Sequence, residues 1–415
     1  MLRILAAVVL ALVAASPAQA KRPRPNNVPA AQTTIAPNDL QLYNEYASPE
    51  STYASERVVV HYVVLGIDAP PLNDDDRDSV PDYVQRVGEA ADDALGYYER
   101  RGFRVPLPDD GGPDSRPDLY ISRFSPGTLG VAFPAANADG GAFAVISNSL
   151  DPSAERSFAS VYATVAHELF HLVQFSYFAR GAEPILPPWI LEGTAAGLES
   201  RVYPELDDLV SSLQLRHWFS ATQVPLTEQS YGAQLLWGYL DAREPRLLPA
   251  LLARLGEHPK QGDDLHDVAG TFVRVAGAPL APVFTRFALS VAALHAHDIR
   301  PLFDLRRDGT HRVTVAPLAV HFVRPVLPRR GSYAIRVRFP RGRETASATL
   351  TFELEDDIPG RPASFRRVAG RWSEGGRSVT FAIPRALRAD PRLLVPRLVV
   401  ANGGEQPVRY VVSVR

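Results

Sequence analysis

The residues best suited to do chemistry in this chain are two histidines, His167 and His171. With Glu168 they form the pattern H-E-x-x-H within the segment AHELFH. Because helical residues four positions apart lie on one face, about one turn from each other, the two imidazoles can bind the same zinc ion. Glu168 follows the first histidine, where its carboxylate can take a proton from a water whose pKa the zinc has lowered. The segment therefore predicts a zinc site with Glu168 as the general base.

A helical zinc site of this type needs a third protein ligand, and Glu192 is the candidate. It lies in WILEGTAA, on the next predicted helix after a proline-rich turn, where antiparallel packing would bring its carboxylate to the metal. A third histidine shortly after His171 is excluded, because the chain reads LVQFSY there. Glu199 shares the helical face of Glu192 and either orients a ligand histidine or faces solvent at the end of the helix.

A tetrahedral oxyanion next to zinc usually needs a further hydrogen-bond donor. Tyr231, in SYGAQLLWGYL, is the first candidate for this catalytic role, followed by His217 and Tyr239. Each of the three is also a candidate packing residue, so the sequence leaves both roles open.

An acidic loop precedes the helix that is predicted to begin at Pro81. Positions 1, 3, 5, 7 and 9 of a calcium-loop pattern are occupied by Asp74, Asp76, Asp78, Val80 (through its carbonyl) and Asp82. Position 12 is Gln85 rather than an acid, and position 6 is Ser79, which must adopt a turn conformation that glycine adopts more easily. The loop predicts a weak calcium site or, alternatively, a solvated acidic loop whose carboxylates interact favourably with the helix dipole.

These segments carry a resemblance to a known family. HELFH followed by PWILEGTAA is similar to the gluzincin pattern, in which a tryptophan lies three residues before the ligand glutamate and a glycine follows it. The resemblance implies zinc at His167, His171 and Glu192, with Glu168 as the general base. Most of the chain also resembles secreted bacterial metalloproteases in which an HFxxHY-like strand and a D-x-D-x-D-x-x-P-D-Y segment precede the zinc helix. Here those segments are VVVHYVV (58–64) and DDDRDSVPDY (74–83).

The elements that must position these residues follow from the periodicity of apolar residues. Strands are predicted at 56–66, 118–124 and 141–147, and helices at 81–102, 155–180 and 189–202, with a mainly helical pattern continuing to about residue 298. After about residue 300, apolar and polar residues alternate, as in YAIRVRF (333–339), which predicts an antiparallel β-sandwich. The predicted fold is α+β: a zincin-like catalytic region with a mixed sheet, active-site helices and a helical subdomain, followed by the sandwich.

The predicted boundaries begin with a signal peptide. Arg3, the apolar run 4–15 and the small-x-small end Ala18-Gln19-Ala20 are typical of a secretory signal cleaved after Ala20. The alternative is a buried N-terminal helix. No later stretch is long and apolar enough to span a bilayer, so we expect a secreted or periplasmic protein without a transmembrane segment after signal removal. The further predicted regions are a linker or short pro-segment (21–55), a mixed region with the zinc helices (56–203), a helical subdomain (204–305) and an accessory sandwich (306–415).

Composition excludes several classes of protein. With 46% hydrophobic and 22% charged residues, the chain is not wholly disordered. Its 44 Lys and Arg residues against 46 Asp and Glu residues lack the basic excess of a nucleic-acid-binding protein. It has no cysteine, so a thiolate metal site and a cysteine nucleophile are excluded, and any metal must bind to histidine and carboxylate ligands.

The sequence therefore predicts a secreted zinc metallopeptidase that hydrolyses peptide bonds in a protein or peptide substrate. The alternative is a non-catalytic exported protein, stabilised by calcium, that keeps the metallopeptidase fold and binds or adheres to a surface partner.

Overall fold

The computed structural model describes most of the chain from Tyr46 onward. The described residues are 46, 48–108, 114–125, 128–134, 141–151, 160–178, 186–204, 216–257, 264–294, 298–307, 309–327, 332–340, 345–354, 365–383 and 393–415. The predicted signal peptide and most of the predicted linker lie outside them. The chain divides into two compact units, Met1–Val210 with Leu240–Asp263, and Ser211–Tyr239 with Asp264–Arg415. Both units contain helices and sheets, so the protein is of the α+β class.

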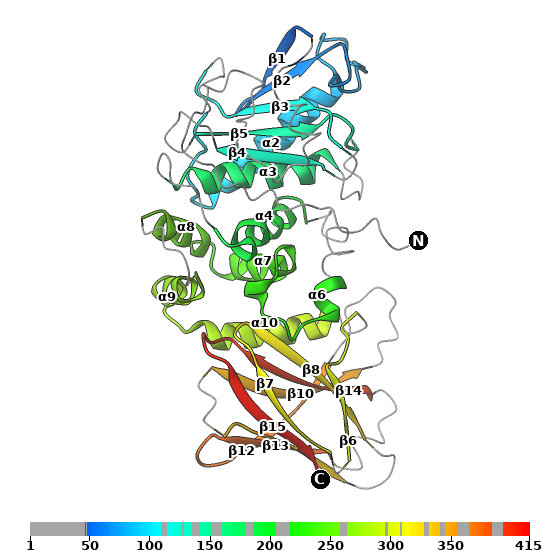
Figure 1. Ribbon diagram of the computed structural model, residues 1–415, viewed down its shortest axis with the longest axis vertical. Helices are drawn as coiled ribbons and strands as arrows, with labels where there is room; N and C mark the ends of the chain where they lie inside the picture. Colours follow the sequence, from blue (N-terminus) through cyan, green and yellow to red (C-terminus); the bar gives the residue numbers. More distant parts are fainter. Residues whose placement is uncertain are drawn as a thin grey trace. The chain divides into compact units, whose positions relative to one another are not determined.

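The first unit is built on a five-stranded sheet with the strand order β1-β2-β3-β5-β4 (Figure 1). Its strands are β1 (Glu50–Ala54), β2 (Val59–Val63), β3 (Asp118–Ser122), β4 (Gly130–Pro134) and β5 (Ala142–Ser147). Strands β2, β3 and β5 are parallel to one another, and β1 and β4 pair antiparallel at the two edges. The three central strands are buried along their whole length, as expected for parallel strands, although they include the polar residues His61, Asp118 and Ser122.

The helices of the first unit are α2 (Asp82–Arg100), α3 (Val161–Phe175), α4 (Pro188–Val202) and α8 (Leu247–Glu257), and the boundary between the units falls within α7 (Gln234–Arg243). Helix α3 packs against α2, α4 and the strands β4 and β5. It begins at Val161 rather than at residue 155, because Ser160 is extended and its hydroxyl accepts a hydrogen bond from Ala163 N at 3.2 Å. Helix α3 therefore contacts both the sheet and the second predicted zinc helix.

Strand β1 corrects a predicted boundary. The sequence places residues 21–55 in a linker or pro-segment, but Glu50–Ala54 pairs with β2, from Glu50 opposite Val63 to Ala54 opposite Val59. Along β1, exposed residues alternate with half-buried ones, and most of the strand is polar, which gives a weaker apolar signal than that of the central strands. The sheet therefore begins at residue 50 rather than 56.

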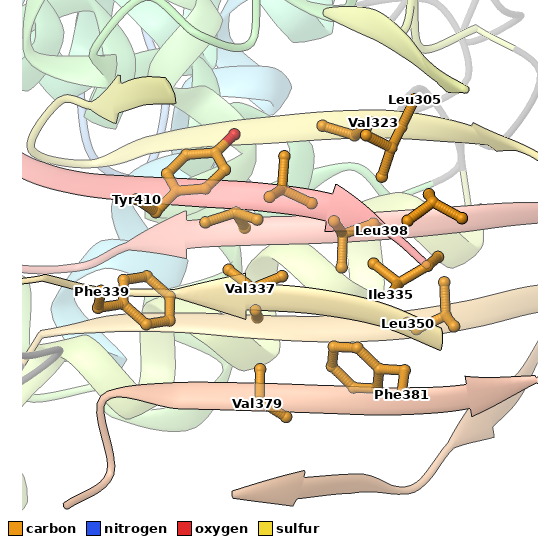
Figure 2. Packing of buried hydrophobic residues seen from close by; sticks show 14 of the residues in the cluster. Leu305, Val323, Ile335, Val337, Phe339, Leu350, Val379, Phe381, Leu398 and Tyr410 are labelled. Atoms are coloured by element: carbon orange, nitrogen blue, oxygen red, sulfur yellow. The ribbon is translucent and has the colours of Figure 1, made fainter. Parts of the chain in front are cut away.

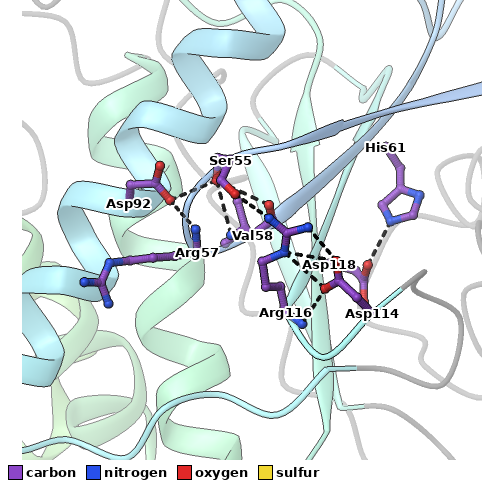
Figure 3. A network of polar contacts seen from close by, with 8 residues as sticks. All are labelled: Ser55, Arg57, Val58, His61, Asp92, Asp114, Arg116 and Asp118. Carbon is purple, nitrogen blue, oxygen red and sulfur yellow. Dashed lines mark hydrogen bonds and ion pairs between the residues drawn. The ribbon is translucent and has the colours of Figure 1, made fainter.

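A polar network holds the connection between β1 and β2 against helix α2 (Figure 3). Asp92, on α2, accepts hydrogen bonds from Ser55 Oγ and from Arg57 N, each at 2.8 Å. Arg116 forms an ion pair with Asp114 and donates a hydrogen bond from Nη1 to the carbonyl of Ser55, each at 2.5 Å. Three segments that are distant in the sequence are thus tied together at the start of the sheet.

His61, on β2, is a buried histidine with two carboxylate partners. Its Nε2 lies 2.8 Å from Asp118 Oδ1, its Nδ1 lies 2.5 Å from Glu50 Oε1, and its ring stacks on Tyr120 at 4.4 Å between centroids. Burial by itself lowers the pKa of His61, but the hydrogen bonds and negative charges of Asp118 and Glu50 outweigh it and raise the pKa to about 9. At neutral pH the ring is therefore a cation that ties β1 and β3 to β2.

The second unit contains the remaining helices of the described residues. They are α6 (Arg216–Ser220), the 3₁₀ helices η4 (Leu226–Glu228) and η5 (Tyr231–Ala233), α9 (Asp264–Ala276) and α10 (Leu280–Leu294). The predicted helical region 204–305 is thus divided between the units, with α8 in the first and α9 and α10 in the second. Among the described residues, no single helix is long and apolar enough to cross a membrane; Leu265–Ala276 and Leu280–Ala293 pass that test only as a pair bent by 96°.

Two five-stranded sheets face each other in the second unit, in the orders β11-β10-β14-β8-β6 and β12-β13-β9-β15-β7. Their strands are β6 (Phe303–Arg306), β7 (Thr310–Val315), β8 (Ala319–Val326), β9 (Tyr333–Arg338), β10 (Ala346–Leu354), β11 (Phe365–Val368), β12 (Gly370–Trp372), β13 (Ser378–Ile383), β14 (Leu393–Asn402) and β15 (Val408–Val414). Apolar side chains from both sheets form one core, including Leu350, Leu398, Ile335, Phe381 and Tyr410 (Figure 2). The pairing is antiparallel, as predicted, except that β6 and β8 are parallel.

Candidate metal centre

Helix α3 presents both predicted histidine ligands to α4. His167 and His171 lie one turn apart with their Nε2 atoms separated by 3.1 Å, and their rings meet edge to face. Only 10% and 9% of their side-chain surfaces are exposed. The helix is buried along most of its length, as its apolar sequence predicts, so the two imidazoles must find their polar partners inside the protein.

Glu192, on α4, completes a triangle of donor atoms with the two histidines. Its Oε2 lies 3.3 Å from His167 Nε2 and 3.7 Å from His171 Nε2. Donor atoms held tetrahedrally at about 2.0–2.1 Å from zinc are about 3.3–3.4 Å apart, and the three distances here lie around that value. Two imidazole nitrogens and one carboxylate oxygen are also a ligand set that catalytic zinc sites use. The three side chains can therefore hold one metal ion, and their spacing is compatible with zinc.

Glu199 resolves the alternative that the sequence left open. It lies two turns after Glu192 on α4, is buried, and places Oε2 3.4 Å from His167 Nδ1. This is the ring nitrogen that faces away from the triangle of donor atoms. Glu199 is therefore an outer partner of a predicted ligand and not a solvent-facing residue at the end of a helix.

Gln174 is a site residue that the sequence reading did not identify. Its side chain is fully buried, and its Oε1 lies 2.7 Å from His171 Nδ1. The sequence feature that points to Gln174 is its position three residues after His171, because helical residues at that spacing share a face. Each predicted histidine ligand therefore has its own outer partner, Glu199 for His167 and Gln174 for His171.

The carboxylates and imidazoles of the centre shift one another's protonation. Burial by itself would raise the pKa of Glu192, but the charges and hydrogen bonds of His171 and His167 hold that pKa well below its usual range. Burial would lower the pKa of His167, but hydrogen bonds to Glu192 and Glu199 raise it well above its usual value. Burial raises the pKa of Glu168, with the nearby histidines opposing the change. The carboxylates around the ligand triangle therefore favour a positive charge there, either a proton on His167 or, once that proton has left, a metal cation.

Glu168 lies against the start of edge strand β4. A Cβ atom added to Gly130 would be 2.7 Å from Glu168 Cγ and 3.0 Å from its Oε1, and also 3.0 Å from Thr164 Cγ2. Only glycine leaves space for the Glu168 side chain in this position. The predicted general base is thus buried between the helix that carries the histidines and the edge of the sheet.

The acidic loop brings three of its predicted ligands together. One carboxylate oxygen each from Asp74, Asp76 and Asp78 lies within 4.8 Å of the others, whereas Asp82 accepts hydrogen bonds from Asp75 N at 3.2 and 3.3 Å. Val80 donates its N–H to Asp78 Oδ1 at 2.8 Å.

Backbone geometry accounts for much of this arrangement. Ser79 has φ +75°, as expected at the position where calcium loops use glycine, and its N–H donates to Asp74 at 3.0 Å. Gln85 donates to Asp78 at 2.9 Å. Hydrogen bonds of this kind also form in a solvated turn, so calcium binding stays a prediction.

The proposed oxyanion donor is not tested by this geometry. Tyr231 begins η5 and belongs to the second unit, whereas the metal ligands belong to the first. Tyr239 packs edge to face on Phe287, as expected for a packing residue. The side chain of His217 lies outside the described residues.

Comparisons with known proteins do not identify a family for this chain. No protein-family model matches it, and no curated protein matches it. Among solved structures, it is similar to the pre-peptidase C-terminal domain of a collagenase from Bacillus anthracis. That match has 12% sequence identity and a TM-score of 0.19, and it covers 28% of this chain and 97% of the other. A likeness at this level carries no functional argument, so any proposal must come from the site itself.

Proposed function

We propose that the protein is an exported, zinc-dependent peptidase of the gluzincin type, with its active site in a zincin-like first unit. One observation carries this proposal: the convergence of His167 Nε2, His171 Nε2 and Glu192 Oε2, from two helices, beside the buried carboxylate of Glu168. The spacing of these residues in the sequence independently predicts each of them at the site. Burying two imidazoles and two carboxylates is also costly even when they pair with one another, so packing alone does not account for this cluster.

The protein's own residues divide the work of hydrolysis. His167, His171 and Glu192 would hold the zinc, which when bound polarises a scissile carbonyl and lowers the pKa of an attacking water. Glu168 accepts the proton from that water on its carboxylate and returns it to the nitrogen of the leaving amine. Burial favours this second step, since it raises the pKa of Glu168 and makes the carboxyl a better temporary holder of the proton.

A peptide substrate is favoured by the position of strand β4. This strand ends the sheet order β1-β2-β3-β5-β4, and among the described residues it pairs with β5 alone. Its first residue, Gly130, is in van der Waals proximity to Glu168. An extended polypeptide can add to an exposed strand edge through main-chain hydrogen bonds, which would bring its peptide bonds past the general base.

The decisive variant is Glu168→Gln, which removes the proton acceptor but leaves the three metal ligands in place. We expect the full chain to bind about one zinc ion in both forms, and the variant to lose hydrolysis of a peptide library by at least about 100-fold. Glu89→Gln is a matched control, because Glu89 is an exposed glutamate on α2 that pairs with Arg86. It should retain both zinc and activity.

Two results would overturn the proposal. Absence of stoichiometric zinc from the wild-type chain would remove the metal centre. Zinc binding without hydrolysis of any library peptide by the wild type would instead support the non-catalytic exported protein.

A further inference from the structure

Both polar atoms of the Gln174 side-chain amide form hydrogen bonds, one within α3 and the other to α4. Its Oε1 faces His171 Nδ1 at 2.7 Å, and its Nε2 donates to the carbonyl of Leu191 at 2.9 Å and to Thr194 Oγ1 at 2.8 Å. The Thr194 hydroxyl in turn donates to the carbonyl of Ile190 at 2.6 Å. A continuous chain of hydrogen bonds therefore runs from a predicted metal ligand to the backbone of the neighbouring helix.

The direction of each hydrogen bond in this series is determined by the backbone carbonyls of α4 at which the series ends. The carbonyls of Leu191 and Ile190 can only accept, so the Thr194 hydroxyl must donate and the NH₂ group of Gln174 must face α4. The atom of Gln174 that faces His171 is consequently its oxygen, and His171 Nδ1 must carry the hydrogen. His171 Nε2 is then the nitrogen with the free lone pair, and it is the one that faces the donor triangle.

We infer that Gln174 is a positioning residue of the metal centre, with two effects that no other side chain at this position could combine. It selects the tautomer of His171 that presents Nε2 to a metal ion, and it fixes α4 at Leu191, the residue directly before the third ligand, Glu192. This inference rests on the proposed metal centre, and it extends that proposal from the ligands to the residue that aligns two of them.

The chemistry requires an amide at this position. A glutamate could accept a hydrogen bond from His171 Nδ1, but its second oxygen could not donate to Leu191, and two acceptors would face each other in a buried site. A methionine is close in volume, but it leaves both His171 Nδ1 and the Leu191 carbonyl without their partner. Both substitutions should therefore weaken metal binding, although a carboxylate is an ordinary partner for a metal-bound histidine.

The test compares zinc affinity in variants of the full chain. Zinc dissociation constants are measured by competition with a chromophoric chelator, the free energy of unfolding is measured on zinc-free protein, and the visible spectrum of the cobalt form reports ligand geometry. Gln174→Met and Gln174→Glu should each weaken zinc binding by about 10–100-fold and alter the cobalt spectrum. Tyr203→Phe is the control, since it deletes another buried hydrogen bond, from Oη of Tyr203, the residue that follows α4, to Ala90 O on α2.

The outcomes separate this inference from the proposed function. If wild-type protein binds no zinc, both fail. If Gln174→Met lowers the free energy of unfolding as Tyr203→Phe does but binds zinc within about twofold of wild type, Gln174 only joins two helices and this inference alone is overturned. If the Gln174 variants do not fold, Thr194→Val and Thr194→Ser are tested instead. Thr194→Val should weaken zinc binding several-fold, and Thr194→Ser should bind zinc as the wild type does. Equal zinc affinity in the two Thr194 variants would overturn the inference.

Discussion

A single oxygen atom of Glu192, the proposed third ligand, faces both histidines of the centre. Glu192→Gln keeps the size of the side chain but removes its negative charge, so we expect zinc affinity to fall by more than about 100-fold. Glu199→Gln should have a smaller effect, about 10–100-fold, because Glu199 lies against His167 Nδ1, the ring nitrogen that faces away from the triangle of donor atoms. Equilibrium dialysis against buffered zinc measures both. Equal losses in the two variants would contradict the assignment of Glu192 as ligand and Glu199 as outer partner.

The position of Glu168 depends on the absence of a side chain at Gly130. In Gly130→Ala the new methyl group would be 2.7 Å from Glu168 Cγ and would displace the carboxylate, while the ligand triangle stays untouched. We expect kcat/KM for a peptide substrate to fall about 10–100-fold with zinc content unchanged, since small misplacements of a catalytic group are costly. Gly270→Ala, where a Cβ would meet nothing within 4 Å, should leave activity unaltered. Full activity in Gly130→Ala would show that Glu168 is not constrained by β4.

The sequence could predict that His167, His171 and Glu192 lie together, but only part of their surroundings. Spacing alone was enough for His167 and His171, because helix geometry fixes residues four apart. The role of Glu199 could not be decided, since a glutamate near the end of a helix is buried or exposed according to how α4 packs on α3. Gln174 was missed for a similar reason: its amide links a histidine to the backbone of another helix, and such long-range bonds leave no periodic signal in a sequence.

At the scale of elements, the start of α3 is held by one side chain. Ser160 is buried and accepts a hydrogen bond from Ala163 N, which satisfies one of the free N–H groups at the helix start. Ser160→Ala should lower the free energy of unfolding by about 1 kcal/mol, and Ser160→Thr should lose less because its hydroxyl can still accept. Denaturant unfolding of zinc-free protein, followed by circular dichroism, checks this. An alanine variant as stable as wild type would mean that the cap does not stabilise α3.

The elements themselves were predictable where one periodicity dominated. Helix α2 and the alternating strands of the second unit bury the apolar faces that their sequences indicate. Strand β1 was not predicted, because a short edge strand with little buried surface has no strong pattern. The parallel pairing of β6 with β8 was not predicted either, since alternation identifies a strand but does not give its direction.

At the scale of the whole molecule, each unit has a buried histidine outside the candidate metal centre with a shifted pKa, His61 and His321, and the two shifts have opposite signs. His61, in the first unit, has a pKa raised to about 9 by Asp118 and Glu50 against the effect of burial. His321, in the second unit, has a pKa lowered to about 4 by burial, and its Nδ1 lies 2.9 Å from the hydroxyl of Tyr410, a residue of the opposite sheet. His61 is thus stable as a cation, and His321 is stable as a neutral ring.

Because the two pKa shifts have opposite signs, the contribution of His61 to stability is lost above neutral pH and that of His321 is lost below it. The folded-state pKa of His61 exceeds the unfolded value near 6.5, so its contribution is complete below pH 6.5 and is lost as pH rises toward 9. The folded-state pKa of His321 is below 6.5, so its contribution is complete above pH 6.5 and is lost as pH falls toward 4. Each amounts to about 3 kcal/mol at most, at about 1.4 kcal/mol per tenfold change in proton affinity.

Hydrogen exchange read by mass spectrometry can follow the two units separately. After correction for the intrinsic pH dependence of exchange, protection of β2 and β3 should fall between pH 7 and 9, and protection of β8 and β15 should fall between pH 6 and 4. His321→Gln should remove the acid-side loss in β8 and β15, because no buried imidazole remains to be protonated there. His266→Gln is the control, since His266 is an exposed histidine of the same unit, with 67% of its side chain accessible, and should leave both profiles as in wild type. Uniform protection of β2 and β3 up to pH 9.5 would mean that His61 is not held as a cation between its two carboxylates.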